Sequence, residues 1–144
     1  MAMYQDPYHE CLCLNARRLS RLVTQTYDER LAPLGLKVTQ FSVLAAAVAR
    51  EGRTDDRADL SLLAQALDLD ISSLSRIVSV LVKQGWVVLV PGKDRRSRKV
   101  ELTEEGRILY GKAFSIWQDT QRDLMAQLPV ERVKALPDLI ARLR

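Results

Sequence analysis

Residues 72–106, SSLSRIVSVLVKQGWVVLVPGKDRRSRKVELTEEG, change their hydrophobic periodicity along the chain and decide the fold. From Ser72 to Gln84 the apolar residues have helical spacing, and Gly85 is typical of the position just after a helix. The next segment, WVVLVP, is β-branched and aromatic, and RKVEL alternates polar and apolar side chains, so both are predicted strands. The charged residues between them predict the turn of a β-hairpin.

A second short helix is expected just before this stretch. Ser61 to Leu67 fits two helical turns with Ser61 as the N-cap, and LDLDI then leads into the helix that starts at Ser72. Two helices joined by so few residues predict a helix-turn-helix. A helix-turn-helix followed by a charged hairpin is the order of a winged helix. The predicted fold class is mainly α, a winged helix-turn-helix with a β-hairpin wing.

The two ends of the chain are predicted to be helical as well. Apolar spacing indicates one helix from about Tyr8 to Leu31, another beginning at Thr39, a long helix capped by Thr103, and a last one after Pro129 with Val133, Leu136, Ile140 and Leu143 on one stripe. We expect a single domain over residues 1–144, with the winged helix-turn-helix at 36–102 and dimerisation helices at 1–35 and 103–144. The alternative is that these terminal helices only cover the core of their own subunit.

Positive charge is concentrated in one part of the sequence. The 144-residue chain carries a net charge of +4. The stretch from Ser72 to Val100 carries +6 and the remainder −2. A local positive field of this kind is expected on a surface that binds a polyanion, although a single basic cluster is more often a solvated surface.

The predicted helix from Ser72 has one face for the core and one for a partner. Leu74, Ile77, Val78 and Leu81 fall on one side, and hydroxyls and cations fall on the other. Small serines allow close approach to a major groove, and arginine can bridge to guanine or phosphate. The candidate DNA-binding residues on this helix are Ser72, Ser73, Ser75, Arg76, Ser79 and Lys83. Capping, packing and a surface ion pair are the alternative roles for these serines and for Arg76.

The predicted hairpin tip adds a second set of candidates. A tip so rich in cations repels itself unless a polyanion lies against it, and a narrow minor groove attracts inserted arginine. We interpret the tip as a wing that contacts DNA through Lys93, Asp94, Arg95, Arg96 and Arg98. Asp94 would weaken phosphate attraction, so we expect it to orient a neighbouring guanidinium.

Several functional classes are disfavoured. The longest apolar run, Val43 to Ala49, is far shorter than the roughly 20 residues of a membrane span. With no signal pattern at the start and only Cys11 and Cys13, a reducing cytoplasm is expected. The single histidine, His9, has no evident catalytic partner, so we expect no enzyme, no metal site and no cofactor.

The order of these motifs resembles the MarR family of dimeric winged-helix transcription regulators. The resemblance covers nearly the whole chain, and its most specific part is the pattern D-x-R-x-x-x-V-x-L-T-x-x-G, matched by Asp94, Arg96, Val100, Leu102, Thr103 and Gly106. It implies a homodimer held by the terminal helices, recognition through residues 72–84, and a wing whose Arg96 enters the minor groove with Asp94 orienting it. It further implies repression that a small effector, often an aromatic acid, relieves. A two-fold dimer predicts a near-palindromic DNA site with half-sites about one helical turn apart.

The cysteines are similar to those of one branch of that family, the organic hydroperoxide regulators, in which an oxidised cysteine is held by a tyrosine. Cys13, Cys11 and Tyr27 are therefore the candidate redox residues, although Arg17 and Val38 occupy two further tyrosine positions of that branch. On one continuous helix the two cysteines point apart, whereas Arg17 lies one turn after Cys13 and would favour the thiolate. Ordinary packing of both cysteines is the alternative.

A small-molecule pocket and two other functions complete the sequence-based hypotheses. The candidate effector pocket consists of Arg17, Tyr27, Phe41 and Trp117, with Arg18 or Arg21 as further cations for a carboxylate. A nonspecific architectural DNA binder would use the wing without reading sequence. A thiol enzyme is the other, less favoured alternative.

Overall fold

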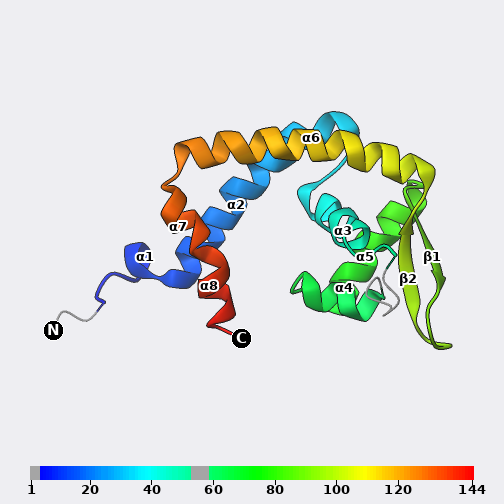
Figure 1. The fold of residues 1–144 in the computed structure, drawn as a ribbon. Helices are drawn as coiled ribbons and strands as arrows, with labels where there is room; N and C mark the ends of the chain where they lie inside the picture. The colour runs from blue at the N-terminus through cyan, green and yellow to red at the C-terminus, as the bar shows by residue number, and fades with distance from the viewer. Residues whose placement is uncertain (1–3, 53–58) are drawn as a thin grey trace.

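The computed structural model describes residues 4–52 and 59–144 and confirms a mainly helical winged-helix architecture. A long helix, α6 (Glu104–Gln127), runs along the top of the molecule in Figure 1. The helices α3 to α5 and the hairpin lie below one of its ends, and α7 and α8 lie below the other. The remaining bounds are α1 (Pro7–Glu10), α2 (Leu12–Leu31), η1 (Ala32–Leu34), α3 (Val38–Val48), α4 (Leu60–Ala66), α5 (Ile71–Lys83), β1 (Val87–Pro91), β2 (Arg98–Leu102), α7 (Val130–Lys134) and α8 (Leu136–Ala141).

The predicted helix-turn-helix is present as α4 and α5, but aspartates cap both helices. The Asp59 carboxylate accepts a hydrogen bond from the backbone N–H of Ser61 at 2.8 Å, and the Asp70 carboxylate accepts one from Ser73 at 3.0 Å. The cap of α4 therefore lies two residues before the predicted cap Ser61, and α5 begins one residue before the predicted start at Ser72. Residues 53–58, which precede α4, lie outside the described residues.

The hairpin follows α5 as predicted. Gly85, with φ of 77°, ends the helix in the left-handed conformation that glycine adopts without a Cβ penalty. The backbone N–H of Trp86 then donates to the carbonyl of Leu81 at 3.0 Å, and β1 begins. The two strands are antiparallel, from Val87 opposite Leu102 to Pro91 opposite Arg98. An isolated bridge between Asp59 and Lys99 ties β2 to the start of α4.

The junction of the hairpin with α6 depends on Thr103, the predicted cap. Its hydroxyl oxygen accepts from the N–H of Gly106 at 3.0 Å and donates to the carbonyl of Gly85 at 2.6 Å. Its own N–H donates to the carbonyl of Trp86 at 3.0 Å. A Cβ on Gly106 would lie 1.9 Å from that same carbonyl oxygen, so the close approach of α6 to β1 requires glycine.

The buried core lies between the winged helix and the first half of α6. Its largest fully buried side chains come from α2, the segment that follows it, α3, α4, α5 and the hairpin: Leu31, Leu36, Val43, Leu44, Leu63, Leu74, Val78, Leu81, Val87 and Val100. Within residues 4–52 and 59–144, no single helix is both long and apolar enough to cross a membrane. The segments 12–34 and 38–48 pass such a length and composition test only as a pair, across a bend of 78°.

The predictions for the terminal helices need three corrections. The first helix is broken at Cys11, because the side-chain amide of Asn15 takes the carbonyl of His9 and the Cys11 sulfur accepts from the N–H of Leu14. The second begins at Val38, not Thr39, since Asp28 of α2 accepts from the N–H of Val38 at 2.8 Å. The last consists of two short helices, since the ring of Pro137 disfavours a continuous helix there.

Candidate nucleic-acid interface

The exposed face of α5 carries the polar side chains that its sequence predicts. Leu74, Val78 and Leu81 are buried against the core, and Ile77 is half-buried. The opposite side of the helix faces solvent through Ser72, Arg76, Ser79 and Lys83. The structure therefore separates a packing face from a face that a groove of DNA could accept.

Two of the candidate serines of α5, Ser73 and Ser79, use their hydroxyls in hydrogen bonds within the chain. The hydroxyl of Ser73 donates to Asp70, and the hydroxyl of Ser79 donates to the carbonyl of Ser75 at 2.8 Å. The hydrogen bonds from Ser73 hold the pKa of the Asp70 carboxyl below its ordinary value of 3.8. Ser73 is half-buried and belongs to the helix cap, whereas Ser72 is exposed at the start of the helix. Asp70, and not Ser72, therefore caps α5, and the hydroxyl of Ser73 donates to the Asp70 carboxylate.

The wing candidates Lys93, Asp94, Arg95, Arg96 and Arg98 are all exposed at or beside the hairpin tip. The Asp94 carboxylate accepts hydrogen bonds from the backbone N–H groups of Arg96 and Ser97, both at 3.0 Å. Within residues 59–144, the hydrogen bonds of Asp94 join it to backbone groups and to the Ser97 hydroxyl, and not to the predicted guanidinium. In this structure Asp94 orders the backbone of the tip.

The wing and the helix-turn-helix enclose an open hollow of about 570 Å³. Lys93, Arg96 and Arg98 line it from the hairpin, and Ser61 and Ile71 line it from the starts of α4 and α5. The predicted cations of the wing thus face the helix-turn-helix across one concave surface. Ser61 and Ile71 were not among the predicted site residues, because their place beside the wing follows from tertiary packing.

The candidate redox residues are not brought together within one chain. Cys13 is exposed in the first turn of α2, and Cys11 is half-buried at the break before it. Tyr27 lies 14 positions after Cys13 on the same helix, about 21 Å along its axis. Its hydroxyl instead donates to Gln121 of α6, and burial raises its pKa. The premise that both cysteines lie on one continuous helix is wrong, since Cys11 lies outside α2.

The candidate effector residues separate into two places. Phe41 and Trp117 stack with ring centroids 6.3 Å apart, in a cluster that also contains Tyr110 and Phe114, which sequence reasoning missed. Phe114 is 38% exposed, so the cluster reaches the surface. Arg17, by contrast, lines a hollow along α2 with Cys13 and Arg21. An i, i+3, i+4, i+7 search along α6 from Trp117 would have found both missed aromatics.

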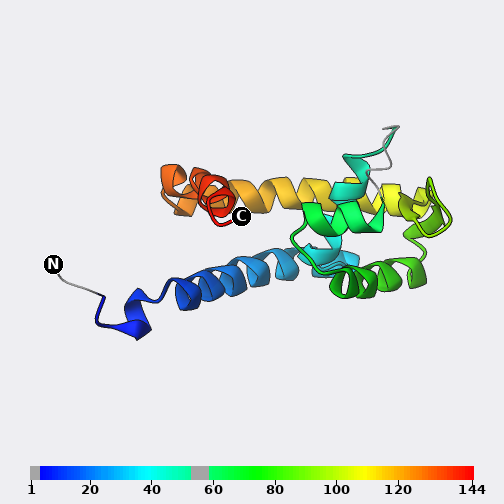
Figure 2. The ribbon, with the colours of Figure 1, turned by 90° about the horizontal axis from the view of Figure 1, so that it is seen from below.

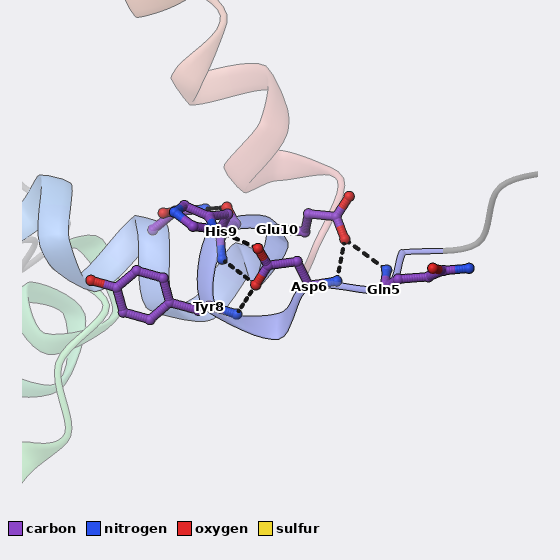
Figure 3. Close-up of polar contacts among 6 residues, drawn as sticks. Gln5, Asp6, Tyr8, His9 and Glu10 are labelled. Carbon is purple, nitrogen blue, oxygen red and sulfur yellow. Dashed lines mark hydrogen bonds and ion pairs between the residues drawn. The ribbon is translucent and has the colours of Figure 1, made fainter.

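The N-terminal helix α1 uses its polar groups for its own cap. Figure 3 shows the Asp6 carboxylate accepting from the N–H groups of Tyr8 and His9, at 2.9 and 3.2 Å, and contacting the His9 ring. The Glu10 carboxylate accepts from the N–H groups of Gln5 and Asp6. The contact with His9 lowers the pKa of Asp6. The described residues contain no group of three or more side chains placed to hold a metal ion.

Comparison with known proteins identifies relatives over nearly the whole chain. A family model described as MarR family matches residues 34–97. The multiple antibiotic resistance protein MarR of Escherichia coli is 28% identical, over 99% of this chain and 98% of its own. Among solved structures, the transcriptional regulator MosR of M. tuberculosis in complex with DNA is 32% identical, with a TM-score of 0.78, covering 93% of this chain and 98% of its own. A mutant of E. coli MarR complexed with operator DNA is 25% identical with a TM-score of 0.77, covering 96% and 99%.

Proposed function

The chain belongs to the MarR family of transcription regulators, and from that premise we propose that it is a DNA-binding repressor that acts as a homodimer until a chemical signal releases it. The observation that carries this function is the continuous exposed surface formed by α5 and the wing. Serine hydroxyls and the cation Arg76 on α5 are followed along the chain by the cations of the hairpin tip.

The shape of this surface suits the two grooves of DNA differently. In this proposal α5 enters the major groove by its N-terminal end, where Ser72 and Arg76 lie and where small side chains permit close approach. The wing tip extends beyond α4 and α5, as Figure 1 shows. In this proposal its Arg96 reaches an adjacent minor groove. Lys93 and Arg98 contact phosphates beside it.

Two copies of the chain are needed to cover the terminal helices. In the single chain, large apolar side chains of α1, α2 and α8 are exposed, among them Tyr8, Leu12, Leu22, Leu139 and Ile140. Exposed apolar side chains gathered on neighbouring helices are typical of an interface, and α1 and α8 lie at the end of the molecule away from the wing. We assign this surface, within residues 1–35 and 103–144, to the dimer interface.

The test of DNA recognition compares the upstream DNA of the protein's own gene with random DNA across salt concentrations. Specific binding predicts a clear preference for the upstream DNA. Arg76→Ala should reduce that preference by about 1–3 kcal/mol at one base position, whereas Arg96→Ala should weaken binding and lower the salt slope by about one. Lys112→Ala, which removes an exposed cation from the middle of α6, is the control. Equal affinity for both DNAs would favour a nonspecific architectural binder instead.

Two signals are supported by separate features of the chain. An oxidant could act on Cys13, which is exposed and one helical turn from Arg17. A small aromatic acid could bind at the aromatic cluster of Phe41, Tyr110, Phe114 and Trp117, which reaches the surface at Phe114. Because the protein must reach DNA to act, we place it in the cytoplasm. We propose no enzyme activity.

The two signals are separated by adding each to the DNA complex. An organic hydroperoxide should release wild-type protein and spare Cys13→Ser, with Cys11→Ser as the matched variant. An aromatic acid such as salicylate should quench tryptophan fluorescence and release DNA, and Trp117→Phe should lose the quenching while Trp86→Phe retains it. Release by neither compound would contradict both assignments.

A further inference from the structure

The six residues that close the hairpin, 92–97, are held by a network centred on Ser97. Beyond the two bonds that the Asp94 carboxylate accepts, the hydroxyl of Ser97 accepts from the N–H of Asp94 and donates to its carbonyl, both at 3.2 Å. The carbonyl of Ser97 accepts from the N–H of Gly92 at 2.9 Å. Gly92, Asp94 and Ser97 are thus bonded to one another across the turn, and Ser97 takes part in every link except the bond from the N–H of Arg96 to Asp94.

Close packing also holds two of these residues, Gly92 and Ser97, against each other. A Cβ on Gly92 would lie 2.1 Å from the Ser97 hydroxyl and 2.8 Å from its Cβ. Such distances are far inside van der Waals contact, and atoms of the short serine side chain cannot move away without leaving the network. Gly92 is therefore needed for space, and its φ is not in the left-handed region.

The tip carries a charge density that would favour an open loop. Lys93, Arg95 and Arg96 all lie within the six residues that the network spans, and Arg98 follows directly. Like charges this close repel each other and would spread a flexible loop before DNA is bound. Ordering such a loop during binding costs conformational entropy, and an already ordered tip avoids that cost.

We propose that Gly92, Asp94 and Ser97 form a lock that orders the wing before DNA arrives, with Ser97 as its positioning residue. The proposal rests on the DNA-binding function given above. In the lock, one carboxylate oxygen of Asp94 accepts hydrogen bonds from two backbone N–H groups. These bonds, and not attraction between the negative charge of Asp94 and the guanidinium groups, fix the positions of the arginines. Asparagine has an equivalent acceptor without the charge and forms the same type of turn.

The experiment measures the free and the bound protein separately. Amide hydrogen exchange of Arg96 and Ser97 reports the lock without DNA, and titration with upstream and random DNA reports binding. The variants are Ser97→Ala, Gly92→Ala, Asp94→Ala and Asp94→Asn. Ser115→Ala and Gly111→Ala are matched controls on α6, where Ser115 is exposed and a Cβ on Gly111 meets open space.

The lock predicts faster exchange in Ser97→Ala, Gly92→Ala and Asp94→Ala, with upstream-DNA affinity lowered about three- to tenfold. Asp94→Asn should keep slow exchange and bind more tightly than Asp94→Ala. Equal weakness of the Asn and Ala variants would show that the charge matters and would overturn the proposal, as would wild-type exchange in Ser97→Ala. Failure of the wild type to prefer upstream DNA would instead count against the proposed function, and the exchange data would still judge the lock.

Discussion

The hydroxyl of Thr103 donates a hydrogen bond to the carbonyl oxygen of Gly85 at 2.6 Å, which joins the start of α6 to the end of α5. The same oxygen caps α6 by accepting from the N–H of Gly106. One side chain therefore fixes the position of the candidate recognition helix relative to the long helix that leads away from it.

Replacing Thr103 by valine should destabilise the protein by about 1–2 kcal/mol, because the shape is kept while the cap and the bond to Gly85 are lost. Thr103→Ser keeps the hydroxyl and should cost less. Urea unfolding followed by circular dichroism measures both. Equal losses for valine and serine would show that the methyl group, and not the hydroxyl, is what matters.

Gly106→Ala should be more damaging than most glycine substitutions in a helix. The added Cβ would meet the Trp86 carbonyl oxygen at 1.9 Å, so β1 or α6 must shift, at a cost of about 1–3 kcal/mol. Gly111→Ala lies in the same helix in open space and should stabilise the protein by about 1 kcal/mol. Opposite signs in thermal unfolding are the expected outcome, and a stabilised Gly106→Ala would contradict the packing at this junction.

The ion pair between Arg30 and Asp123 links α2 to α6 with a distance of 2.7 Å and should contribute to stability in a pH-dependent way. The hydrogen bond from Arg30 lowers the pKa of Asp123 below its ordinary 3.8 in the folded protein. Because the pKa of this carboxyl is lower in the folded than in the unfolded protein, its ionised form stabilises the fold at pH values above the ordinary pKa. This stabilisation is lost as the pH falls through the lowered, folded-state pKa. The difference in stability between wild type and Arg30→Gln should therefore be constant from neutral pH to about pH 5 and shrink below about pH 4.

Measuring that difference by urea unfolding at each pH cancels the acid response of Asp6 and Asp70. Their pKa values are also lowered, by partners that Arg30→Gln leaves in place. A difference that does not change with pH would show that Arg30 acts through packing alone.

Leu139→Asp should convert the protein to a monomer if the terminal helices form the dimer interface. Leu139 of α8 and Ile108 of α6 are each 54% exposed in the single chain, but Ile108 lies at the winged-helix end of α6. Ile108→Asp is therefore a control matched in exposure and chemistry. Sedimentation equilibrium should show a loss of dimer only for Leu139→Asp, and equal behaviour of the two variants would contradict the assignment of the interface.

Local signals explain which elements could be predicted from the sequence. Thr103 caps α6 through the N–H of Gly106, three residues away, and Gly85 ends α5 through its own backbone conformation, so both helix boundaries are predictable from local residue types. Asp59 and Asp70 were missed as caps because Ser61 and Ser72 are equally suitable residue types beside them. The choice between neighbouring caps depends on the angle at which the chain enters each helix.

Longer-range contacts explain the remaining differences. The break at Cys11 depends on Asn15 reaching the carbonyl of His9, which a periodicity of apolar residues does not report. The aromatic cluster joins Phe41 of α3 to Tyr110 and Trp117 of α6, residues about 70 positions apart in the sequence. The sequence predicts which charged residues lie at the wing tip. It does not predict that the Asp94 carboxylate accepts from the backbone N–H groups of Arg96 and Ser97, because that depends on the conformation of the turn.

The length of α6 has a mechanical consequence for any signal that reaches the protein. Its 24 residues span about 36 Å from the Thr103 junction to the terminal helices. A tilt of about 5° at one end of a rod this long displaces the other end by roughly 3 Å, as much as the length of a hydrogen bond. Figure 2 shows α6 passing beside the winged helix and continuing well beyond it. A compound bound near the far end could therefore pull a recognition helix out of register with DNA without touching it, and weak binding energy would be enough if it favoured the tilted position.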